Sequence, residues 1–80
     1  MNRADLRFLA DLDVGKRGRV VQISGSDDVS LRLLEMGLTP GIEVLAVGQA
    51  PLGDPLELEV RGYRLSIRKS EAARVEIQPS

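Results

Sequence analysis

The 80-residue sequence contains no cysteine and no histidine, and its aromatic residues are limited to Phe8 and Tyr63. A chain without cysteine has no disulfide framework, no thiolate metal ligand and no thiol nucleophile, and a chain without histidine lacks the usual imidazole base and ligand. These absences exclude most enzyme mechanisms. We therefore predict no catalytic residue and expect a protein that is not an enzyme.

An excess of one charge is also missing, since 11 lysines and arginines face 12 aspartates and glutamates, for a formal net charge of -1. No large field is available to attract nucleic acid or anionic lipid. Long apolar runs are absent as well, and residues 1–5 lack the apolar stretch of a signal peptide. We expect a cytoplasmic protein that binds no nucleic acid.

The chain is short, but its composition is typical of a folded protein. Hydrophobic residues make up 42% and charged residues 29% of the sequence, and these are ordinary values for a globular domain. A chain of this length can build only one compact unit. We predict a single domain over residues 1–80, with a core from about residue 9 to residue 77 and any binding surface on its outside.

The clearest strands are residues 56–60 and 63–68, which both alternate strictly between apolar and polar side chains. Arg61 and Gly62 then form a two-residue turn, and the hairpin register that places every apolar residue on one face is selected by the pattern itself. The predicted pairs are Val60 with Tyr63, Glu59 with Arg64, Leu58 with Leu65, and Leu56 with Ile67.

The other elements are shorter and are bounded by turn residues. We predict strands at residues 18–24, 43–47 and 75–77, a single helical turn at residues 70–73, and a turn over residues 10–15 that directs Leu12 and Val14 toward the core.

One longer helix is predicted from a cap at Ser26 or Asp27 to about Met36, because an aspartate accepts a bond from a free backbone N–H and suits the positive end of the helix dipole. Gly37 fits the left-handed position just after a helix end, and Pro40 cannot continue the helix. The apolar residues recur at helical spacing and predict one buried face, formed by Val29, Leu33 and Met36 and widened by Leu31 and Leu34.

About five short strands with one helix inserted after the first predict a mainly β protein. The arrangement that leaves no long exposed strand edge is a small, strongly bent antiparallel barrel. We therefore predict an SH3-like β-barrel.

Two pairs of carboxylates deserve consideration as metal ligands, Asp27 with Asp28 and Glu57 with Glu59. We interpret the first pair as helix-capping residues and the second as the outer face of a strand. Without histidine or cysteine, only coordination of hard cations remains. We predict no metal site and no tightly bound cofactor, and leave open a weak, adventitious contact of a divalent metal with carboxylates.

Basic residues make RNA binding an alternative function. Lys16, Arg17 and Arg19 lie around two glycines, as at the start of ribosomal SH3-like modules, and a second basic set lies further along the chain. RNA-binding barrels stack bases on aromatic side chains, which are scarce here. We prefer to interpret the basic residues as a solvated charged face, and the second set consists of Arg61, Arg64, Arg68, Lys69 and Arg74.

Four segments together resemble the FeoA family: residues 32–41, which end a helix, turn at glycine and proline and enter a strand, and residues 50–56, 62–68 and 71–73. The resemblance covers residues 9–77. It implies an SH3-like fold and a role in bacterial ferrous iron uptake, with the cytoplasmic region of the FeoB membrane permease as the partner. The chain is then expected to meet a membrane only through that partner. FeoA-like domains also end DtxR-type metal-dependent repressors, so a metal-sensing domain is a second alternative, although we identify no helix-turn-helix before the barrel.

The partner-binding surface is predicted on two rigid proline loops, the turn after the helix and residues 50–55, because such loops present side chains at low entropic cost. Two arginines add charge complementarity. Leu52, which no alternation places in the core, is expected to be exposed. Four glycines are assigned to structural turns, Gly37, Gly41, Gly53 and Gly62. The predicted contact residues are Arg32, Leu38, Thr39, Pro40, Ala50, Pro51, Leu52, Asp54 and Arg68.

Overall fold

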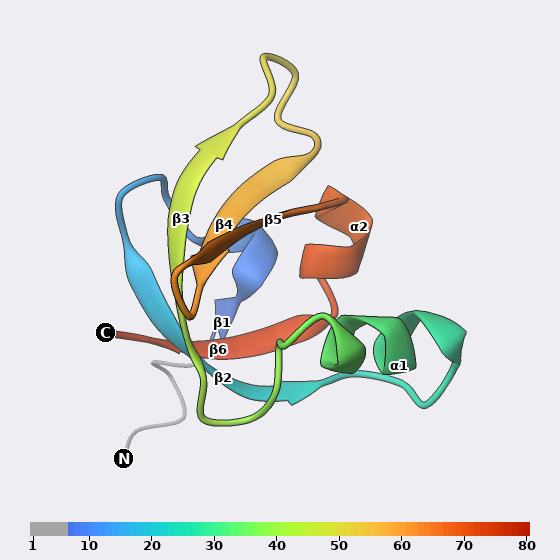
Figure 1. Cartoon of the computed structure of the whole chain (residues 1–80). Coiled ribbons are helices and arrows are strands. Elements are labelled where there is room, and N and C mark those ends of the chain that lie inside the picture. The colour runs from blue at the N-terminus through green and yellow to red at the C-terminus, as the bar shows by residue number, and fades with distance from the viewer. Residues whose placement is uncertain (1–6) are drawn as a thin grey trace.

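Six strands form one antiparallel sheet, in the order β1-β6-β2-β3-β4-β5, in the computed structural model, which describes residues 7–80 (Figure 1). Among these residues no pairing joins the two end strands β1 and β5, so the sheet is bent but open. The elements in chain order are β1 (Arg7–Phe8), the 3₁₀ helix η2 (Leu9–Asp11), β2 (Arg17–Ile23), α1 (Asp28–Glu35), β3 (Glu43–Gln49), β4 (Leu56–Val60), β5 (Tyr63–Ile67), α2 (Lys69–Ala72) and β6 (Val75–Pro79).

The predicted mainly β fold and the single longer helix after the first predicted strand are confirmed, with differences in the strands. The sheet has six strands rather than five, because the two-residue strand β1 is too short to show alternation. Register shifts in β2 between Val20 and Gln22 and in β3 between Ala46 and Gly48 bend the sheet. The expectation that residues 1–5 form no signal peptide concerns residues outside the described range.

The hairpin of β4 and β5 has the predicted register, with Leu58 opposite Leu65. Arg61 and Gly62 have φ values of 52° and 85°, which are the two positive angles that a type I′ turn requires. Tyr63 is the exception to the buried face, since its side chain remains 45% exposed. Its hydroxyl donates a hydrogen bond of 2.8 Å to the Met36 carbonyl oxygen at the end of α1.

Helix α1 begins at the predicted cap, where the Asp27 side chain accepts a hydrogen bond from the Ser30 backbone N–H. The helix ends in a Schellman motif, in which the N–H of Gly37 donates to the Leu34 carbonyl and the N–H of Leu38 donates to the Leu33 carbonyl. This motif brings Leu33 and Leu38 together, and both side chains are fully buried.

Two predictions about buried residues are wrong. Leu31 and Leu34 are 54% and 38% exposed, because only the Leu33 side of α1 faces the core. Val14 is 53% exposed, because the predicted turn points only Leu12 toward the core. The buried cluster itself is drawn from the sheet, η2, both α-helices and the turn after α1 and consists of Leu9, Val20, Leu33, Leu38, Val44, Leu56, Leu58, Val60, Ile67, Ala72, Val75 and Ile77.

Candidate partner-binding groove

An open groove of about 820 Å³ lies between α1, the end of β5 and α2, a volume within the range of ligand-binding clefts. Its charged lining residues are three arginines and one glutamate, so the groove is basic on balance. Apolar side chains line it as well. We call this feature the basic groove, and it is lined by Val29, Arg32, Met36, Pro55, Ser66, Ile67, Arg68, Ser70, Glu71 and Arg74.

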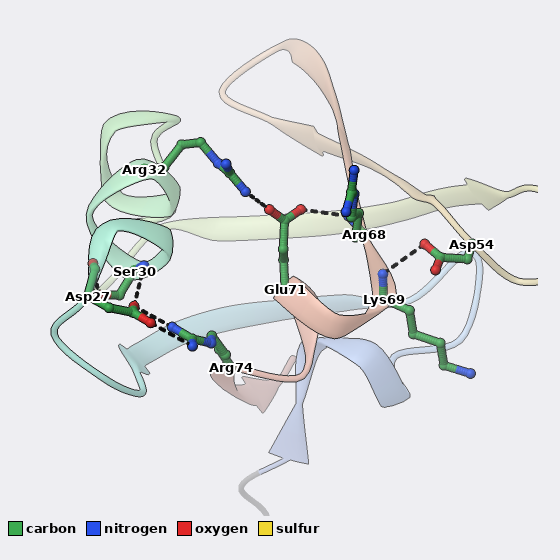
Figure 2. A network of polar contacts seen from close by, with 8 residues as sticks. All are labelled: Asp27, Ser30, Arg32, Asp54, Arg68, Lys69, Glu71 and Arg74. Atoms are coloured by element: carbon green, nitrogen blue, oxygen red, sulfur yellow. Dashed lines mark hydrogen bonds and ion pairs between the residues drawn. The ribbon is translucent and has the colours of Figure 1, made fainter.

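Glu71 connects the two sides of the basic groove (Figure 2). One of its carboxylate oxygens accepts a hydrogen bond of 2.8 Å from the Arg68 backbone N–H and so caps α2, while the other is paired with the Arg32 guanidinium on α1. The β3–β4 loop is tied to the same helix, because the Lys69 backbone N–H donates to Asp54 Oδ1 over 2.9 Å. These contacts link α1, α2 and this loop.

A second polar contact ties the start of α1 to the end of α2. The two terminal guanidinium nitrogens of Arg74 donate to the carboxylate of Asp27, over 2.5 Å and 2.8 Å, while Asp27 also caps α1. These hydrogen bonds hold the pKa of the Asp27 carboxyl well below its usual range, and the Asp27 carboxylate raises the pKa of Arg74. Figure 2 shows the two side chains meeting edge to edge between the helices.

Acidification is expected to weaken the fold through this contact. Since the folded-state pKa of Asp27 is depressed, its stabilising effect is complete above the unfolded value of about 3.9 and is lost as the pH falls below it. Thermal melting of the wild type and of Asp27→Asn from about pH 6 to about pH 2.5 measures this effect. We expect the melting temperature of the variant to fall less steeply than that of the wild type.

Asp28→Asn is the matched control, because Asp28 is the neighbouring carboxylate at the same helix start and makes no hydrogen bond to Arg74. The melting temperature of Asp27→Asn should fall less steeply with acidification than that of Asp28→Asn. If the melting temperatures of Asp27→Asn and the wild type fell equally steeply with pH, the contact between Asp27 and Arg74 would not be the source of the acid sensitivity.

The structure brings some of the predicted contact residues together. Arg32 and Arg68 both line the basic groove, and Asp54 lies at its border through its bond to Lys69. Leu52 is 96% exposed, as expected. Ala50 is half-buried and Pro51 is exposed in the same loop.

The other predicted contact residues do not join this surface. Leu38 is fully buried, so its assignment to the binding surface is wrong. Thr39 and Pro40 lie in the turn after α1, and Figure 1 shows this turn and the β3–β4 loop at opposite ends of the molecule. A single surface made of both proline loops is therefore not formed. The four predicted turn glycines all have positive φ values, between 84° and 106°.

Sequence reasoning missed several groove residues, above all Glu71 and Arg74. The signal for Glu71 was its position three residues after Arg68 at the start of a short helix, which is the spacing of a capping box. Arg74 and Asp27 are 47 residues apart, and no local pattern connects them. Residues 7–80 contain no group of three or more aspartates and glutamates placed to hold a metal ion. Within the same residues, no helix has the length and apolar character needed to cross a membrane.

The open six-stranded antiparallel sheet with α1 and α2 packed at its side defines a small domain of the SH3-like class. The sequence model of the FeoA domain matches residues 8–79. The chain belongs to the FeoA domain family.

Known proteins support both statements. A FeoA-like protein from Clostridium acetobutylicum superposes with a TM-score of 0.89 at 33% identity, over 99% of this chain and 90% of that one. The zinc complex of Stenotrophomonas maltophilia FeoA, described as a prokaryotic SH3 domain protein, superposes with a TM-score of 0.79 at 32% identity, over 90% and 89% of the two chains. A manganese-dependent transcriptional repressor shares the fold alone, with a TM-score of 0.83 at 13% identity over 94% of this chain and 42% of that one.

A curated relative from Porphyromonas gingivalis (strain ATCC BAA-308 / W83) carries the similar segment inside a larger protein. It is named as a fusion of Fe(2+) transport protein A with the Fe(2+) transporter FeoB. It is 33% identical over 70 residues, which are 88% of this chain and 8% of the relative. The chain thus spans less than a tenth of the length of this relative.

Proposed function

We propose that this chain is a non-enzymatic accessory of ferrous iron uptake that binds the cytoplasmic region of a FeoB-type permease and modulates it. The observation that carries the proposal is the relative in which the similar domain and FeoB form one polypeptide. Two domains fused in one chain are held at high effective concentration, so a weak contact between them is enough to act. A separate chain must make the same contact by its own surface.

The proposed partner contact consists of the basic groove and the exposed β3–β4 loop beside it. Asp54 and Pro55 connect the two, since Asp54 is bonded to the start of α2 and Pro55 lines the groove. Leu52 is the apolar anchor of this surface, because an almost fully exposed leucine gains most from burial at an interface. Ferrous iron is the cargo of the partner in this proposal, and the chain itself carries no resident cofactor and stays in the cytoplasm.

Leu52→Ala tests the proposal. We expect the substitution to weaken binding to the purified cytoplasmic region of FeoB by about 1–2 kcal/mol, the usual scale for truncating an interface contact. The free energy of unfolding should change by less than about 1 kcal/mol, because the side chain makes no core contact. Calorimetric titration and thermal melting of the same variant measure the two quantities.

Val14→Ala is the control, since Val14 is an exposed apolar residue outside the proposed surface. It should bind like the wild type. Wild-type affinity of a folded Leu52→Ala variant would remove the loop from the contact. Absence of any binding by the wild-type chain would overturn the proposed function itself.

A further inference from the structure

Strand β5 is the last strand of the open sheet and pairs with β4 alone. A strand in this position exposes backbone N–H and C=O groups along its free edge, and an extended segment of another chain can pair with them. The end of β5 also forms one wall of the basic groove, since Ser66 and Ile67 line it. An added strand can therefore bond only to those backbone groups of β5 that do not pair with β4.

The register of the hairpin identifies these groups. In a two-residue turn the flanking pair, Val60 and Tyr63, is hydrogen-bonded, and hydrogen-bonded pairs then alternate with non-bonded pairs along the ladder. Arg64 and Ser66 fall in the non-bonded pairs, opposite Glu59 and Glu57. Their N–H and C=O groups thus point away from β4.

Arg68 gives independent support for this assignment, because it is the next residue after Arg64 and Ser66 whose backbone groups should point away from β4. Its N–H donates to Glu71 Oε1 and its carbonyl accepts bonds from the Glu71 and Ala72 N–H groups, all in α2. Helix α2 therefore closes one end of the free edge. Within residues 7–80, no hydrogen bond reaches the outward N–H and C=O groups of Arg64 and Ser66.

The side chains around this edge set the chemistry of its occupant. The Arg68 guanidinium forms no ion pair among residues 7–80, whereas Arg32 and Arg74 are paired with Glu71 and Asp27. Arg64 is also exposed on the same strand. Apolar contact is available from α1, where the half-buried Val29 and Met36 line the opposite wall of the groove. A segment that alternates acidic and apolar residues complements both features.

We infer that the free edge of β5 is a docking site for an extended acidic segment of the partner, which adds to the sheet as a seventh strand beside the basic groove. Main-chain bonds to Arg64 and Ser66 supply affinity, and the Arg68 charge with the apolar wall of α1 selects the sequence. The inference rests on the proposed function only for the identity of the partner as FeoB.

Amide hydrogen exchange of the full chain, followed by NMR, tests the inference with two probes. One is the purified cytoplasmic region of FeoB, and the other is a short acetylated peptide of alternating glutamate and valine, with a lysine and valine peptide as its control. We expect the FeoB region and the glutamate and valine peptide to protect the amides of Arg64 and Ser66. The lysine peptide should leave them unprotected.

Variants of the protein separate backbone pairing from charge. Ser66→Pro removes an outward N–H without touching the bonds to β4, and it should weaken binding of the acidic peptide at least about tenfold. Arg68→Glu should also weaken it about tenfold. Lys16→Glu makes the same change of charge just before β2, which β3 and β4 separate from β5 in the sheet, and it should bind like the wild type.

Two modified forms of the acidic peptide repeat the test with the protein unchanged. One form is N-methylated at its odd-numbered residues and the other at its even-numbered residues. Pairing with β5 predicts that the two forms differ in affinity, because only every second N–H of the added peptide strand bonds to β5. Equal affinity would overturn the inference, as would binding of FeoB and the acidic peptide with the Arg64 and Ser66 amides unprotected. In that case FeoB binding still upholds the proposed function. Protection by the acidic peptide without any binding of FeoB upholds the docking site and overturns the proposed partner.

Discussion

Leu38→Ala is expected to lower the free energy of unfolding by about 2–5 kcal/mol, the range for removing a leucine from a close-packed core. The side chain is fully buried and packs in the main cluster with Leu33. The Schellman motif ties the Leu38 backbone to the end of α1 through the bond from the Leu38 N–H to the Leu33 carbonyl, so the surroundings have little freedom to close over the cavity. Chemical denaturation of the purified variant measures the change.

Binding distinguishes a core residue from a contact residue at this position. If Leu38 is part of the core, the folded fraction of Leu38→Ala should bind the cytoplasmic region of FeoB with wild-type affinity. Leu52→Ala is the matched leucine truncation on the surface and should show the opposite pattern. A variant at Leu38 with wild-type stability and lost affinity would restore this residue to the contact surface.

Gly37→Ala should be the second most damaging of the substitutions considered. The φ angle of 106° disfavours any residue with a Cβ atom, at a cost of about 1–3 kcal/mol. A Cβ atom at this position would also lie 2.6 Å from the Tyr63 hydroxyl oxygen, closer than two such atoms can approach. The hydroxyl is held in place by its bond to the Met36 carbonyl, so relief requires breaking that bond. Chemical denaturation of Gly37→Ala measures the combined loss of unfolding free energy from the backbone strain and the clash.

A double-mutant cycle separates the two causes. Tyr63→Phe alone loses one hydrogen bond and should cost about 0.5–1.5 kcal/mol. In the Tyr63→Phe background, Gly37→Ala should cost less than it does in the wild type, because the clashing oxygen is gone and only the backbone strain remains. Strictly additive effects would show that the hydroxyl contact is irrelevant. Gly41→Ala, at a positive φ with no atom near its Cβ position, reports the backbone strain alone.

Local sequence patterns determine the parts of the fold that were predicted correctly. The β4–β5 register follows from strict alternation around Arg61 and Gly62, since a slip of one residue would bury charges. The limits of α1 follow from Asp27 and Gly37, which satisfy the helix ends by short-range bonds. The helix-ending glycine also predicts that Leu38 is buried, because an apolar residue directly after the glycine of a Schellman motif packs back on the helix.

The basic groove could not be predicted in the same way, because distant segments form it. Arg74 meets Asp27 across 47 residues and Arg32 meets Glu71 across 39, and no periodicity relates their positions. The exposure of Leu31 and Leu34 depends likewise on which side of α1 packs on the core, which is a property of the tertiary packing. Of the predicted contact residues, Arg32 and Arg68 line the groove, whereas the turn after α1 lies away from the β3–β4 loop (Figure 1).

The position of β6 in the sheet has a consequence for how the chain folds during synthesis. This strand lies between β1 and β2, so Val20 pairs with Ile77 near the other end of the described chain. The hairpin of β4 and β5 can form as soon as it is made, but β2 keeps an unpaired edge until β6 has left the ribosome. Such distant pairing folds more slowly than local contacts do. A nascent chain therefore exposes β2 to aggregation until β6 completes the sheet.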